Sequence, residues 1–145
     1  MSVNDNIFLN NDDVAIYFVK NDSSSNADYN WFGNNATNYN TEPATTNTGI
    51  TTWRFLNATA DSDVMSIQDA CDIVFKLYAY TPDGVSEYDS SRLKAFNLTV
   101  TPTNGRVNTT KAELGESVQY TAESAGIGEI TATIEYVAYS ISVPI

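Results

Sequence analysis

Histidine is absent from this sequence, cysteine occurs once, and Lys and Arg together occur only seven times in 145 residues. Without histidine the chain lacks the commonest general base and the commonest metal ligand, and it cannot form a Ser-His-Asp or Cys-His arrangement. The single cysteine, Cys71, excludes an intramolecular disulfide, and its place beside an apolar run predicts a buried, inert thiol. These absences argue against catalysis, so we expect a protein that is not an enzyme and needs no cofactor.

Positive charge is also scarce, since seven basic residues stand against 18 acidic ones and the formal net charge is −11. The Lys and Arg residues form no cluster along the chain. Binding to nucleic acid or to an anionic lipid surface requires such clusters, because cations must displace the counterions of the phosphates. We therefore expect neither a nucleic acid nor a membrane as partner. The acidity favours solubility, with cation binding or docking onto a basic protein surface as the alternatives.

The acidic residues do not form a recognisable metal motif. Asp61 and Asp63, followed by Asp69, come closest to the spacing of a calcium loop, but the third acid and the glycine of such a loop are missing. We expect solvated carboxylates in turns at these positions and no metal site.

Long hydrophobic runs are missing as well. No apolar stretch approaches the roughly 18 residues that cross a bilayer as a helix. The first six residues, Met-Ser-Val-Asn-Asp-Asn, contain neither the basic nor the apolar region of a secretory signal. We expect synthesis in the cytoplasm without a signal peptide, with a mature fragment that has gained a new Met as the alternative.

The most strand-like stretch is residues 73–80, Ile-Val-Phe-Lys-Leu-Tyr-Ala-Tyr. Successive side chains of a strand point to opposite faces, so Ile73, Phe75, Leu77 and Ala79 should share the buried face. The Thr-Pro-Asp-Gly sequence of residues 81–84 then predicts a turn, because Pro presets φ and Gly accepts a positive φ. We expect this strand to lie in the middle of a β-sheet.

Further strands and turns follow at short intervals. Residues 61–70 are ambiguous between a short helical turn and a polar edge strand, and residues 84–91 read as a polar excursion. In the last segment the apolar residues change parity near Tyr136, which predicts a bulge or a bend there. The other predicted strands cover residues 7–9 and 14–19, as a hairpin or consecutive pair, and residues 50–56, 93–101, 106–110, 118–122 and 129–145.

This spacing of strands, with no helical pattern of ten residues, predicts an all-β fold and a single β-sandwich domain over residues 1–145. Residues 96–102, 114–118 and 130–134, all within residues 93–145, resemble the later strands of bacterial and phage immunoglobulin-like domains. The resemblance implies an immunoglobulin-like or jelly-roll-like architecture, and it implies nothing about activity.

A long polar loop is predicted near residues 21–49, where Asn, Ser, Thr and Asp dominate. It carries Tyr29, Trp31, Phe32 and Tyr39, and such aromatic side chains on a polar loop are typical of protein interfaces and of sugar-binding surfaces. We select these four as interface residues. The alternative for Trp31 and Phe32 is that they belong to the core of a strand.

Polar residues without charge dominate the composition, with 16 Asn, 17 Thr and 13 Ser. This composition, low in Lys and without His, resembles that of bacteriophage virion structural proteins. The resemblance implies a capsid decoration or cement protein, or a tail or fibre subunit, in the virion. Such a subunit binds other capsid or tail proteins and forms a homo-oligomer, of which a symmetric trimer is one example. A carbohydrate-binding module or lectin-like receptor-binding domain is the alternative.

Overall fold

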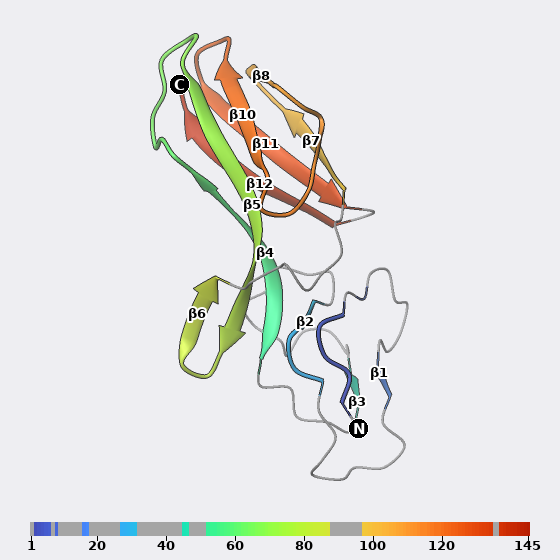
Figure 1. Ribbon diagram of the computed structural model, residues 1–145. Coiled ribbons are helices and arrows are strands. Elements are labelled where there is room, and N and C mark those ends of the chain that lie inside the picture. The colour runs from blue at the N-terminus through green and yellow to red at the C-terminus, as the bar shows by residue number, and fades with distance from the viewer. Residues whose placement is uncertain are drawn as a thin grey trace. The chain divides into compact units, whose positions relative to one another are not determined.

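The computed structural model describes residues 2–6, 8, 16–17, 27–31, 45–46, 52–87, 97–134 and 137–145. These residues form β-strands and no helix, so the predicted all-β fold is confirmed (Figure 1). The strands are β1 (Ile16–Tyr17), β2 (Asn30–Trp31), β3 (Thr45–Thr46), β4 (Trp53–Ala60), β5 (Ala70–Thr81), β6 (Gly84–Glu87), β7 (Leu98–Pro102), β8 (Gly105–Val107), β9 (Lys111–Ala112), β10 (Ser117–Ala122), β11 (Ile127–Ile134) and β12 (Val137–Pro144).

Contacts between residues divide the chain into two compact units. Unit 1 comprises Met1–Leu56 and Leu77–Leu93, and unit 2 comprises Asn57–Lys76 and Lys94–Ile145. The division falls within β4 and β5, so each unit contains one part of both strands. The prediction of a single domain over residues 1–145 stays a prediction.

Unit 2 is a β-sandwich. Its first sheet contains the unit 2 parts of β4 and β5 followed by β10 and β8, and its second sheet has the order β12-β11-β7-β9. Side chains from both sheets form the buried core, because alternate residues of each strand point inward. Its members are Cys71, Ile73, Phe75, Leu98, Val100, Ala112, Val118, Tyr120, Ala122, Ile130, Ala132, Ile134 and Val143.

The central strand is confirmed, and β5 extends beyond the predicted range at both ends. The four residues predicted to face the core are all buried. The predicted turn is confirmed too, since Thr81 pairs with Gly84 and the φ of Gly84 is +127°. The prediction of a polar excursion over residues 84–91 is wrong for residues 84–87. These residues form β6, which pairs antiparallel with β5. The sequence of β6 lacks the alternation of apolar and polar residues that marks a half-buried strand, because all four of its residues are exposed.

The change of parity near Tyr136 has a different cause from the predicted bulge or bend within one strand. Strands β11 and β12 are antiparallel neighbours, and Ile134 pairs with Val137. The two sets of apolar residues therefore belong to two strands, whereas a bulge would have kept them in one. Strands β7, β8 and β10 lie within or next to their predicted ranges, and β4 begins three residues later and ends four residues later than predicted.

Residues 61–69 form neither of the two structures considered for them, because they make an irregular loop between β4 and β5. Backbone hydrogen bonds attach this 61–69 loop to β5, β10 and β12 of the sandwich. The N–H of Met65 donates to the carbonyl of Pro144 (2.9 Å), and the N–H of Gln68 donates to the carbonyl of Ala122 (2.8 Å). Met65 is the residue of the loop that enters the core.

In unit 1, strand β2 pairs in parallel with β4. Trp31 in β2 also bonds the N-terminal segment, since its N–H donates to the carbonyl of Asn6 (3.0 Å) and its carbonyl accepts from the N–H of Phe8 (2.8 Å). The predicted polar loop of residues 21–49 contains β2 and β3, and β3 pairs in parallel with β1. Most of the hairpin predicted over residues 7–19 lies outside the described residues.

Candidate interaction surface at the tip of unit 2

The structure describes two of the four predicted interface residues, Tyr29 and Trp31. Tyr29 is exposed, whereas Trp31 is buried. The Tyr29 side chain is 39% exposed, and Tyr29 has a positive φ of 61° beside β2. Trp31 is only 1% exposed, which favours the core alternative for this residue over a free indole ring on a loop. Phe32 and Tyr39 lie outside the described residues.

Large aliphatic side chains are exposed at one end of unit 2. Val64 is 69% exposed, Ile67 is 51% exposed and Ile127, at the start of β11, is 62% exposed. The loop and β11 meet there, because Met65 bonds Pro144 and Pro144 pairs with Ile127. We call the surface formed by Val64, Ile67 and Ile127 the tip surface. Single exposed aliphatic residues are ordinary, but three at one end of a sandwich mark a candidate contact area.

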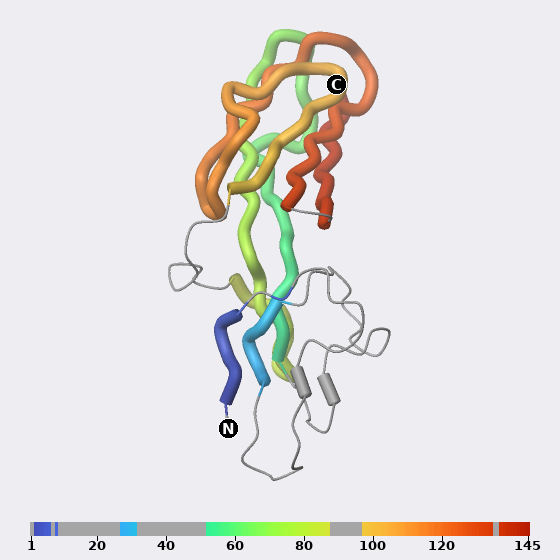
Figure 2. Tube along the Cα trace, turned by 90° about the vertical axis from the view of Figure 1, so that its right-hand side faces the viewer, coloured from blue at the N-terminus to red at the C-terminus, as the bar shows by residue number. Residues whose placement is uncertain are grey.

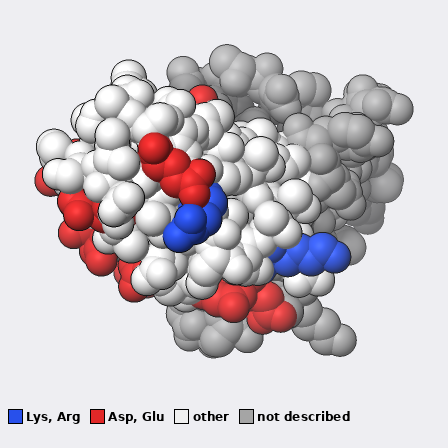
Figure 3. All heavy atoms as spheres, turned by 90° about the horizontal axis from the view of Figure 1, so that it is seen from above, with Lys and Arg blue, Asp and Glu red and all other residues white. Residues whose placement is uncertain are grey.

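The 61–69 loop at this end itself carries three exposed acidic residues, Asp61, Asp63 and Asp69. Seen from above, the described part of the surface is mostly uncharged, and its acidic and basic side chains lie in small separate groups (Figure 3). Arg106 of β8 forms an ion pair with Glu123, and the atoms Nη1 of Arg106 and Oε1 of Glu123 are 2.8 Å apart. Both side chains are well exposed, so the pair contributes little to stability and is available to a partner.

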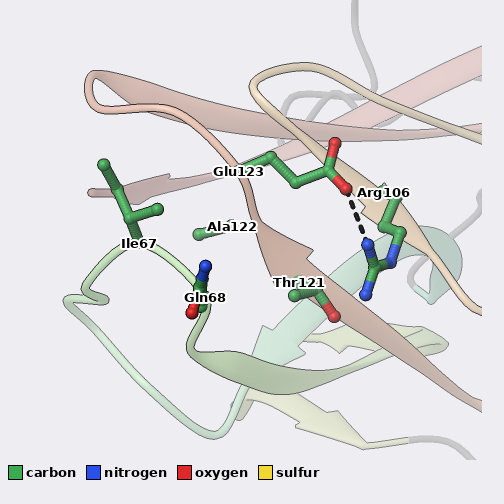
Figure 4. A pocket seen from close by; sticks show the side chains of 6 residues that line it. All are labelled: Ile67, Gln68, Arg106, Thr121, Ala122 and Glu123. Atoms are coloured by element: carbon green, nitrogen blue, oxygen red, sulfur yellow. Dashed lines mark hydrogen bonds and ion pairs between the residues drawn. The ribbon is translucent and has the colours of Figure 1, made fainter.

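An open pocket of about 340 Å³ adjoins Ile67. The 61–69 loop forms one wall with Ile67 and Gln68, and the end of β10 with the Arg106–Glu123 pair forms the other (Figure 4). Gln68 has a positive φ of 75°, and its N–H is used by the bond to Ala122. The two walls of the pocket together offer one aliphatic side chain, an amide and an ion pair. This lining suits a polar peptide better than a flat apolar ligand.

Two acidic residues near this end accept hydrogen bonds from backbone N–H groups and so stabilise the local loop structure. The Asp61 carboxylate accepts a bond from the Asp72 N–H (2.9 Å), and the Asp69 carboxylate accepts one from the Ser66 N–H (2.9 Å). Burial, together with the charges of Asp61 and Asp72, raises the pKa of the Cys71 thiol, as expected for an unreactive side chain. Among the described residues no group of three or more acidic or cysteine side chains is arranged to hold a metal ion.

Unit 1 carries a second set of aromatic side chains that the sequence did not single out as a site. Trp53 of β4 stacks on Tyr80 of β5 with ring centroids 4.4 Å apart, and Phe55 stacks on Tyr78 at 5.9 Å. Trp53, Tyr78 and Tyr80 are half-buried. The signal was present, since Tyr78 and Tyr80 alternate with the core residues of β5. The pairing of β4 with β5 cannot be read from the sequence, and this pairing brings the rings together.

Within the described residues, no helix has the length and apolar character needed to cross a membrane. Comparison with known proteins found no family model that matches the chain, and no match among curated proteins or solved structures.

Proposed function

We propose that this chain is a non-enzymatic structural protein of a virion, either a capsid decoration or cement protein or a tail or fibre subunit. It binds neighbouring capsid or tail proteins through the tip surface of unit 2. The observation that carries the proposal is the exposure of Val64, Ile67 and Ile127 at one end of a β-sandwich.

The chemistry of this end supports adhesion to protein. Interfaces combine an apolar centre with a polar rim that supplies hydrogen bonds. At the tip surface the aliphatic side chains supply the centre, and Gln68 with the Arg106–Glu123 pair supplies polar groups beside it. The composition supports the same proposal, because Asn, Thr and Ser provide neutral hydrogen-bonding groups over the rest of the chain.

The test is binding to virus particles that lack this protein, prepared from a deletion strain of the virus that encodes it. Wild-type protein should sediment with the particles at a defined stoichiometry. The double variant Val64→Ser/Ile67→Ser should bind at least about tenfold more weakly, because desolvated aliphatic contacts at the centre of an interface carry much of its binding energy.

The matched control is Val85→Ser, since Val85 is 54% exposed but lies on β6 of unit 1. This variant should bind like the wild type. The proposal is wrong if wild-type protein does not bind the particles and is absent from complete particles by mass spectrometry. Equal binding by the Val64→Ser/Ile67→Ser variant would show that the contact lies elsewhere on the chain.

A carbohydrate-binding module is the second candidate, favoured by the half-buried rings of Trp53, Tyr78 and Tyr80 in unit 1. Aromatic rings stack on the apolar faces of sugars, and neighbouring polar groups bond the hydroxyls. Binding to one member of a polysaccharide panel that is lost in Tyr80→Ala, with the tip variants unaffected, would favour this function. Tyr29→Ala tests the predicted loop site in the same assay.

A further inference from the structure

Strand β12 forms one edge of the second sheet of unit 2. Among the described strands its neighbour in this sheet is β11, and nothing described pairs with its other side (Figure 2). The strand is eight residues long, and its sequence, Val-Ala-Tyr-Ser-Ile-Ser-Val-Pro, contains no charged residue. Proteins usually protect an edge of this length with charged side chains, bulges or a covering segment. An uncharged edge of this kind is suited to pairing with another strand.

The ladder between β11 and β12 determines which backbone groups of β12 point outward. Gly126 and Ile145 exchange both of their hydrogen bonds, with N–O distances of 3.3 and 2.8 Å. Bonded and non-bonded pairs alternate along an antiparallel ladder, and Ile127 opposite Pro144 is the next pair. Every second residue of β12 therefore directs its N–H and C=O away from β11. These residues are Ala138, Ser140, Ser142 and Pro144.

The C-terminal end of this edge is already closed. Pro144 has no N–H, and its carbonyl accepts the bond from the Met65 N–H. Ala138, Ser140 and Ser142 remain, with three N–H and three C=O groups for which the described residues provide no partner on that side. The side chains of these three residues are exposed, small and uncharged, so nothing on them obstructs an approaching strand.

We propose that β12 pairs antiparallel with β12 of a second copy of this chain, about a two-fold axis that passes at Ser140. In this pairing Ala138 lies opposite the partner's Ser142, and Ser140 lies opposite its own equivalent. Six backbone hydrogen bonds form, and the two second sheets join into one continuous sheet. Tyr139 lies opposite the partner's Ile141, and both side chains are only half-buried in the single chain, so the pairing covers more of their apolar surface.

Three other edge strands of the described sheets are shorter than β12, since β9 has two residues, β8 has three and β6 has four. Strand β12 is self-complementary over its whole free length, so a second copy fits this edge. A two-fold pairing closes on itself, which gives a dimer, whereas a symmetric trimer was one example of the homo-oligomer that the resemblance to virion proteins implies. The inference does not rest on the proposed function, because it involves neither the exposed side chains of the tip surface nor a virion partner.

The experiment measures the mass of the full-length protein by sedimentation velocity over a broad range of concentration. We expect a reversible dimer that tightens as salt is added, because two chains of charge −11 repel each other. Ser140→Lys should raise the dissociation constant about tenfold or more, since it places like charges directly opposite each other at the axis. The double variant Ala138→Lys/Ser142→Glu should dimerise at least as well as the wild type, because opposite charges then face each other.

Thr101→Lys is the matched control, because Thr101 is exposed on β7 in the interior of the same sheet. It should leave the dimer unchanged, and equal melting temperatures for all the variants should show that each is folded. A monomer at every concentration and salt would overturn the proposal. A closed trimer would also overturn it, as would a dimer that Ser140→Lys does not weaken or that Ala138→Lys/Ser142→Glu disrupts.

Discussion

Gly128 of β11 lies directly against the phenol ring of Tyr120, so closely that a Cβ atom at Gly128 would lie 2.9 Å from the ring atom Cζ. Gly105 lies against the same ring, and there a Cβ atom would lie 2.6 Å from Cε2. Tyr120 is fully buried, and its hydroxyl donates a hydrogen bond to the carbonyl of Thr103 (2.9 Å). Two glycines in strands thus make room for one large aromatic side chain in the core of unit 2.

Gly128→Ala should therefore destabilise unit 2. The added methyl group cannot be accommodated without moving the ring or the backbone, and overpacking of this kind costs about 1–3 kcal/mol of the free energy of unfolding. Urea denaturation measures the loss. Glu129→Ala, at an exposed position next along the same strand, should change the free energy of unfolding by less than about 0.5 kcal/mol. Equal stability of Gly128→Ala and the wild type would mean that the Tyr120 ring can move to accommodate the added methyl group without loss of packing.

The sequence predicts most of unit 2 because its strands combine clear alternation with turn residues. In β5 the alternate apolar residues identify the buried face, and residues 81–84 identify the turn. The reversal between β11 and β12 was missed because residues 135 and 136 are Glu and Tyr, neither of which is typical of a turn. The sequence therefore predicts one strand with a bulge or a bend where the structure has two strands in succession.

The candidate surface was hidden for a different reason. Val64, Ile67 and Cys71 have helical spacing, so the sequence leaves residues 61–70 open between a short helical turn and a polar edge strand. In the structure Val64 and Ile67 face solvent and Met65 enters the core instead. The pattern of hydrophobic residues predicts which side chains favour burial. In an irregular loop, long-range hydrogen bonds such as the one from the Met65 N–H to the Pro144 carbonyl determine which side chains are buried.

The stability of the protein should fall at alkaline pH, partly through Cys71. Burial, assisted by the charges of Asp61 and Asp72, raises the pKa of this thiol above its ordinary value. The folded state then holds the proton more firmly than the unfolded state does. This contribution is complete below the pKa of the unfolded thiol, about 8.5, and is lost as the pH rises through the folded pKa.

Urea midpoints measured from about pH 8 to about pH 10 should decline in the wild type and decline less in Cys71→Ala. Tyr120 has a pKa raised in the same direction, chiefly by burial, so Tyr120→Phe should reduce the further loss of stability above about pH 10. An identical pH profile in Cys71→Ala and the wild type would contradict the assignment to the thiol.

The guanidinium of Arg54, fully buried in unit 1, forms an ion pair with the partly exposed carboxylate of Asp5. Asp5→Asn keeps the size of the side chain and tolerates the positive φ of 62° at this position, but it removes the charge. We expect a loss of about 2 kcal/mol in the free energy of unfolding, because hydrogen bonds to charged groups contribute about 1.5–3 kcal/mol.

Asp83→Asn is the control for this pair, since Asp83 is an exposed turn residue of unit 1. The double variant Asp5→Asn/Arg54→Met should be more stable than Asp5→Asn alone, because it also removes the buried positive charge. If Asp5→Asn unfolds at the same urea concentration as Asp83→Asn, the ion pair does not stabilise the fold.

Asn30 should hold the N-terminal segment of unit 1 in place. Its side chain is buried, donates hydrogen bonds to the carbonyls of Val3 (2.5 Å) and Ala27 (2.7 Å), and accepts one from the N–H of Asn6 (2.9 Å). Asn30→Ala removes these bonds and also the bond that the Asn6 side-chain amide donates to Asn30 (3.3 Å). Of the backbone groups that lose a bond, that of Ala27 is buried, that of Val3 is half-buried and that of Asn6 is exposed, and a buried polar group left unsatisfied costs about 1–3 kcal/mol. We therefore expect local detachment of the N-terminal segment before global unfolding.

Hydrogen exchange of the backbone amides distinguishes this local opening from a general loss of stability. In Asn30→Ala the amides of Asn6 and Phe8 should exchange about 100-fold faster, while the amides of β10 and β11 keep their rates. Asn108→Ala is the matched control, because the exposed Asn108 side chain also accepts a backbone bond, from Gln119 (2.9 Å), but does so in unit 2. Unchanged protection of Asn6 and Phe8 in Asn30→Ala would mean that the backbone bonds to Trp31 hold this segment without the Asn30 side chain.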